Sequence, residues 1–133
     1  MNDSGPVSKK ALRAGYIMTA PSVLLLIFSA IMKLAKPVSV VDGMAHFGIS
    51  ENLLLPLGIV ELACTAIYLI PSTAVLGAIL LTGYLGGATC ACLRVGEPFI
   101  PAVLVGVFVW GGLFLRDPRV RALIPLRRAE ART

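Results

Sequence analysis

The chain has 133 residues, of which 57% are hydrophobic and 14% are charged, and its mean hydropathy is +0.88. This composition lies outside the usual range of soluble domains and predicts a single integral membrane domain over residues 1–133. The formal net charge of +5 comes mostly from basic residues near the two ends of the chain, which is typical of a membrane topology signal and excludes nucleic-acid binding as the expected function.

Four apolar runs are candidates for membrane-spanning helices, because a span needs roughly 20 mostly apolar residues to cross about 30 Å of hydrocarbon. In chain order they are approximately residues 12–32, 53–70, 74–93 and 99–115. The first run follows basic residues, as a secretory signal does, but it is long and no A-x-A cleavage pattern follows it, so we expect it to be retained. The predicted fold class is all-α, an integral membrane four-helix bundle.

The connection between the first two spans, residues 34–50, is long enough to contain structure of its own. Its apolar residues recur at helical spacing: Pro37, Val40, Val41, Met44 and Phe47. We therefore expect a short amphipathic helix lying in the membrane interface between spans 1 and 2. The pattern leaves open whether this helix is a connector or a lid over a site within the membrane.

The distribution of basic residues predicts the orientation of the spans. Lys9, Lys10 and Arg13 precede the first span, and a basic tail over residues 116–133 follows the last one. The positive-inside rule then places both termini in the cytoplasm, which requires an even number of spans, and four satisfies it. The expected location is the inner (cytoplasmic) membrane, with the arginines of the tail serving as a topological signal or contacting lipid headgroups.

Glu61 lies in the middle of the second span, roughly 13 Å below Asn52 if the helix rises about 1.5 Å per residue. A bare carboxylate at that depth costs about 3 kcal/mol or more. Glu61 must therefore be protonated or paired with a cation, and the candidates are Lys33 and Arg94, near the ends of the first and third spans. Two interpretations remain open: a salt bridge that pins helices together, or a site for a ligand or a proton.

Other polar residues are predicted to share one inward face of the bundle with this carboxylate. Tyr84 and Thr82 lie at about its level in the third span, while Cys64 and Thr65 follow it by three and four residues on the second. We also expect Pro21 to kink the first span. Gly83 and Gly87 have the small-xxx-small spacing that allows close helix approach, either inside the chain or in a homodimer.

The candidate site residues follow from these positions. Glu61 is the candidate catalytic residue, and the candidate ligand-binding residues are Lys33, Glu61, Tyr84, Arg94 and His46. Cys90 and Cys92 are two residues apart, so their side chains point apart on a helix and cannot form a disulfide with each other. With one histidine and no C-x-x-C, neither a metal site nor a covalently held cofactor is expected.

Four segments carry a resemblance to a known family. They are "FSAIMKLAKP", "LGIVELACTAIYLIP", "LGAILLTGYLGGATCACLRVGEPF" and "WGGLFLRDPRVRALIPLR", and they make the chain after residue 12 resemble the DoxX-like small membrane proteins. The resemblance implies a four-helix membrane bundle and an association with redox physiology, since the family name comes from a subunit of a thiosulfate:quinone oxidoreductase. Cys92 stands where relatives often have a histidine, so a role of that histidine does not carry over.

Three function classes are compatible with these observations. The first is a redox-associated protein that binds a quinone or another isoprenoid or lipid around Lys33, Glu61, Tyr84 and Arg94. The second is a membrane enzyme in which Glu61 transfers a proton to or from a hydrophobic substrate. The third is an assembly or chaperone subunit without its own chemistry. Expected partners are membrane lipid, a hydrophobic small molecule, and a second copy or a larger membrane redox complex.

Overall fold

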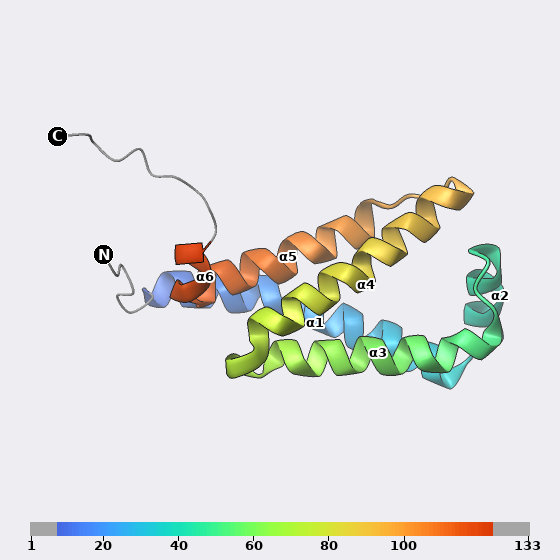
Figure 1. Ribbon diagram of the computed structural model, residues 1–133, viewed down its shortest axis with the longest axis horizontal. Coiled ribbons are helices and arrows are strands. Elements are labelled where there is room, and N and C mark those ends of the chain that lie inside the picture. The colour runs from blue at the N-terminus through green and yellow to red at the C-terminus, as the bar shows by residue number, and fades with distance from the viewer. Residues whose placement is uncertain (1–7, 124–133) are drawn as a thin grey trace.

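The computed structural model describes residues 8–123, and the part of the chain it describes contains helices and no strands (Figure 1). The elements in chain order are α1 (Lys9–Ala35), α2 (Val38–His46), α3 (Glu51–Leu69), the short 3-10 helix η1 (Pro71–Thr73), α4 (Ala74–Val95), α5 (Ile100–Arg116) and α6 (Pro118–Leu123). The all-α prediction is confirmed. Residues 124–133 of the predicted basic tail lie outside the described residues.

Three of these helices are long and apolar enough to cross a membrane: α1, α3, and the continuous helical segment formed by η1 and α4. No more than 33% of each of these windows is buried inside the protein. Large hydrophobic side chains instead point outward, among them Ile17, Leu24 and Phe28 of α1. A surface of this kind is stable in lipid and not in water, so the chain is a membrane protein. The fourth apolar helix, α5, has 17 residues.

Local signals explain where the helices begin and end. The Ser8 hydroxyl accepts a hydrogen bond from the amide of Ala11 (3.2 Å) and caps the start of α1. Lys36 (φ 53°) and Gly96 (φ 75°) adopt left-handed backbone conformations directly after α1 and α4, and Pro37 then prevents α1 from continuing. α1 is helical on both sides of Pro21, which it contains.

The four apolar helices contact one another in a cyclic order, with α1 against α3 and α5, and α4 against α3 and α5. Their buried side chains form one core, with Tyr68 of α3 fully buried at its centre and donating a hydrogen bond to the carbonyl of Val109 (2.7 Å). Glycines allow helix backbones to approach each other closely at two contacts. Gly15 of α1 lies against Gly112 of α5, and Gly77 of α4 lies against the backbone of Tyr68 in α3.

The predicted close approach of a helix of this chain at Gly83 and Gly87 is wrong. A β-carbon at either position would meet no atom within 4 Å, because both glycines line a cavity rather than a helix contact. Figure 1 shows why: α4 and α5 diverge from α1 and α3 toward the end of the molecule that carries α2. The helices are tight at one end and spread at the other.

The helix expected between the first two spans is α2, which lies across the ends of α1 and α3 (Figure 1).

At the opposite end of the molecule, two arginine side chains make contacts within the protein. Arg121 donates hydrogen bonds to the carbonyls of Phe114 (2.8 Å) and Leu115 (2.9 Å), which lie in the last turn of α5. Arg116 lies over the ring of Tyr68, 5.4 Å from its centroid.

Candidate functional site

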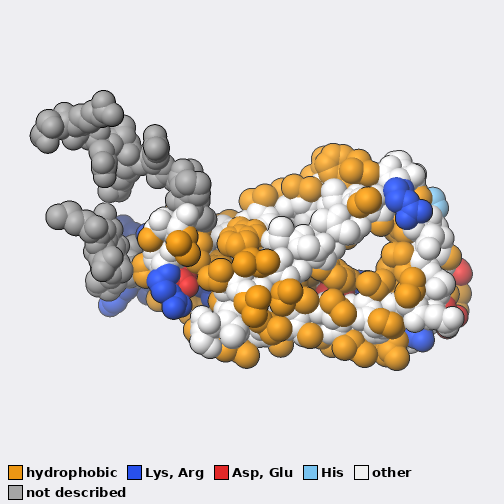
Figure 2. Space-filling view, in the orientation of Figure 1, with side chains coloured by type: hydrophobic (Ala, Val, Ile, Leu, Met, Phe, Trp, Pro, Cys, Tyr) orange, Lys and Arg blue, Asp and Glu red, His pale blue; other side chains and the backbone are white. Residues whose placement is uncertain are grey.

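A cavity of about 670 Å³ lies where the helices spread apart. It is bounded by α1, α3, α4 and α5, and Met44 of α2 and Phe47 close it from the end of the bundle. Its walls are mostly aliphatic and aromatic, and in Figure 2 the space between the helices is visible as an opening at the α2 end. A volume of this size is within the range of roughly 300–1,000 Å³ that holds drug-sized ligands.

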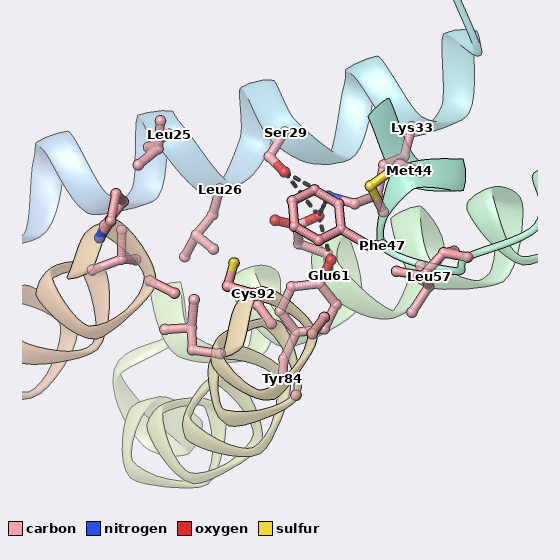
Figure 3. A pocket seen from close by; sticks show the side chains of 18 of the residues that line it. Leu25, Leu26, Ser29, Lys33, Met44, Phe47, Leu57, Glu61, Tyr84 and Cys92 are labelled. Atoms are coloured by element: carbon pink, nitrogen blue, oxygen red, sulfur yellow. Dashed lines mark hydrogen bonds and ion pairs between the residues drawn. The ribbon is translucent and has the colours of Figure 1, made fainter. Parts of the chain in front are cut away.

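One polar cluster interrupts the apolar wall, and it is centred on Glu61, which is 1% exposed. Its carboxylate oxygen Oε2 lies 2.8 Å from Nζ of Lys33 and accepts a hydrogen bond from the Tyr84 hydroxyl at 3.0 Å. Ser29 accepts from Lys33 (2.6 Å) and donates to the same Oε2 (3.4 Å). Figure 3 shows these contacts converging on Glu61 from α1 and α4.

The cluster exists because three helices present one turn each at the same level. Ser29 and Lys33 are four residues apart on α1 and so lie on one face of it, which α3 packs against. Lys33 lies in the last turn of α1, and its long aliphatic stem lets its ammonium reach Glu61. The Nζ atom of Lys33 also lies 5.8 Å from the centroid of the Tyr84 ring. Of the two cations expected to pair with Glu61, Lys33 does so.

Arg94 and His46 lie elsewhere. The Arg94 side chain is exposed, with a guanidinium nitrogen near Gly48 in the turn between α2 and α3. His46 lies 3.0 Å from the carboxylate of Glu97, both side chains being about half exposed (55% and 45%). Neither residue lines the cavity. His46 and Glu97 instead connect α2 to the segment between α4 and α5.

The sequence matches the DoxX-like family over residues 17–113, a region that includes the whole polar cluster and most of α1 and α5. The chain belongs to the DoxX-like family. Searches of curated proteins and of solved structures found no match.

Several residues of this DoxX-like protein's site were not among the predicted site residues. Ser29 is one, although its spacing of four residues from Lys33 was a usable signal. Met44 and Phe47 were predicted to form a helix face but not to line a cavity, and Cys92 also lines it. The three cysteines are free, as expected for Cys90 and Cys92.

Two residues expected beside the Glu61 carboxylate do not contact it. Thr82 lies outside the cavity, where its hydroxyl accepts a hydrogen bond from the indole of Trp110 (2.6 Å). Thr65 is buried and donates to the backbone carbonyl of Glu61 (2.7 Å), so it does not reach the carboxylate. The expected position beside Glu61 is therefore wrong for Thr82, which is exposed, whereas Thr65 and Cys64 are buried on the same helix as Glu61, as predicted. Both hydroxyls satisfy themselves locally, as Ser and Thr side chains in apolar helices commonly do.

Proposed function

We propose that this DoxX-like protein is redox-associated and binds an amphiphilic isoprenoid or lipid, with a quinone as the first candidate, in the cavity beside Lys33, Glu61 and Tyr84. What supports the proposal is the combination of an apolar space with one buried ion pair at its wall. A long apolar chain can fill such a space, and the polar cluster can orient a head group. A pair that served packing alone would need no cavity beside it.

The proposed arrangement of the helices in the membrane gives the ligand a route into the cavity. All four apolar helices span the inner membrane with both termini in the cytoplasm, and α2 lies in the outer interface. The 17 residues of α5 rise about 26 Å, which spans the hydrocarbon with local thinning or adjustment at the ends. The cavity then opens within the outer half of the bilayer, where a lipid-soluble ligand can enter between the helices.

Cysteine labelling tests this orientation. In a variant without the three native cysteines, Asp42→Cys on α2 should react with a membrane-impermeant maleimide added to cells whose inner membrane is intact and outer face accessible. Ser72→Cys, in the turn between α3 and α4, should react only after the membrane is opened. Both positions are exposed, so accessibility of the side chain is matched. The reverse pattern would refute the proposed topology.

The ligand is tested by mass spectrometry of the lipids extracted from purified protein. Gly87→Phe should reduce the amount of retained ligand at least about tenfold, because Gly87 lines the cavity and its β-carbon position is open. Gly86→Phe is the matched control: it is the adjacent residue, its β-carbon position is equally open, and it does not line this cavity. Equal retention in the two variants would argue against binding in the cavity.

A second candidate function, proton transfer by Glu61, is favoured by one specific observation. The Tyr84 hydroxyl and the Lys33 ammonium both donate to Oε2, which gives the carboxylate two neighbours that can carry a proton. The assembly-subunit alternative predicts instead that no ligand is retained by the wild-type protein.

We also propose a homodimer. Its contact is proposed on the lipid-facing side of α5 rather than at Gly83 and Gly87, because these two glycines line the cavity.

A further inference from the structure

The two oxygens of the Glu61 carboxylate are unequal. Oε2 accepts hydrogen bonds from Lys33, Tyr84 and Ser29, whereas Oε1 accepts none from any residue between 8 and 123. Within that range, the one side-chain nitrogen or oxygen that is both fully enclosed and without a partner is Nη2 of Arg116. Oε1 is therefore not sealed in protein. Because Glu61 lines the cavity, Oε1 is the acceptor that the cavity offers to a ligand.

Lys33 supplies the complementary group. Its ammonium carries three N–H donors, and two of them are used by Ser29 (2.6 Å) and Glu61 (2.8 Å), which leaves one without a partner in the described part of the chain. A hydroxyl group can donate to Oε1 and accept from Lys33 at the same time. A carbonyl or an ether oxygen can only accept, so it would leave the carboxylate oxygen unsatisfied in an apolar cavity, which is costly.

The charge of the cavity wall further restricts the kind of head group that can bind. Among residues 8–123, Lys33 and Glu61 are the two charged residues that line the cavity, and their opposite charges are 2.8 Å apart, so this wall carries no net charge. A phosphate or carboxylate head group would have to give up its water without gaining a free counter-ion, and it would face the negative Oε1. Phospholipids and isoprenoid diphosphates are therefore disfavoured, and an uncharged head group is favoured.

We propose that the cavity selects an uncharged isoprenoid-type amphiphile whose head group is a hydroxyl that donates to Oε1 of Glu61. For a quinone-type ligand this means the reduced quinol is bound in preference to the quinone. The inference rests on the proposed function, because it specifies the head group of the ligand bound at that same site. It concerns binding alone and assigns no electron transfer to the protein.

A matched pair of probes tests the head group without redox chemistry. Geranylgeraniol and its methyl ether have the same chain, and the ether keeps the acceptor but lacks the donor. We expect the alcohol to bind the full-length protein in nanodiscs about tenfold to a hundredfold more tightly, a ratio that corresponds to about 1.4–2.8 kcal/mol. Affinity is measured by the thermal shift and by protection of Cys92, in the cavity wall, from alkylation, with exposed Cys90 as reference.

Variants identify the responsible group. The double variant Lys33→Met/Glu61→Leu removes both charges together, so no buried ion is left unpaired, and it should bind alcohol and ether equally. Arg94→Gln, an exposed charge change that lies outside the cavity lining, should keep the wild-type preference. Equal binding of alcohol and ether by the wild type would overturn the head-group inference while leaving the binding function in place. A preference that survives in the double variant would also overturn it. Binding of neither probe would overturn the binding function itself, and this inference with it.

Discussion

Glu61→Gln should lower the free energy of unfolding by about 3 kcal/mol, as the breaking of a buried ion pair typically does. The substitution leaves the Lys33 ammonium beside a neutral amide, in a position where little water can reach it. The Tyr84 and Ser29 hydroxyls can still find the amide oxygen, so the loss comes mainly from the stranded positive charge. Reversible unfolding in one mild detergent measures it.

The double variant Lys33→Met/Glu61→Leu provides the control for that result. It replaces both charges by side chains of similar volume, and buried pairs replaced in this way often cost little or nothing in stability. We expect the double variant to be at least 2 kcal/mol more stable than Glu61→Gln, on the order of the penalty for a lone buried ion. If instead the losses of Lys33→Met and Glu61→Gln simply add in their own double variant, the two residues are not energetic partners.

The sequence was sufficient to predict that Glu61 needs a partner but not which partner it has. The cost of a carboxylate in lipid follows from one residue and its depth, whereas the choice between Lys33 and Arg94 depends on how α1 and α4 are rotated about their axes. Rotation is set by amphipathic patterning in soluble helices. In this chain the lipid-facing and core-facing residues are both apolar, so the pattern carries little information about it.

The cavity could not be predicted from the sequence for a related reason. Helix positions are predictable from apolar runs, and α1, α3, α4 and α5 cover the four predicted runs with ends that differ by at most three residues. The space between helices depends instead on where small residues meet a partner. Gly83 and Gly87 have a suggestive spacing and line empty space, whereas Gly77, which lies in no such pattern with them, makes the tight contact.

The contact between Gly77 and the backbone of Tyr68 predicts a large loss of stability when Gly77 is replaced. A β-carbon at Gly77 would overlap the backbone nitrogen and Cα of Tyr68, and a backbone inside a packed helix cannot move aside as a flexible side chain can. Gly77→Ala must therefore separate α3 from α4 next to the most buried aromatic residue of the core. Tyr68 would be displaced from its hydrogen bond to Val109 (2.7 Å). We expect a loss of at least about 2 kcal/mol in the free energy of unfolding, since overpacking typically costs 1–3 kcal/mol.

Gly86→Ala makes the same chemical change on the same helix where nothing opposes it, since its β-carbon would have no neighbour within 4 Å. Alanine is favoured over glycine in a helix by roughly 0.5–1 kcal/mol, so this variant should be as stable as the wild type or slightly more so. The two alanine variants should then differ by about 3 kcal/mol in unfolding free energy, measured in the same detergent. Equal stabilities would mean that α3 and α4 do not approach closely at Gly77, and the wedge shape that opens the cavity at the other end of the same two helices would lose its physical basis.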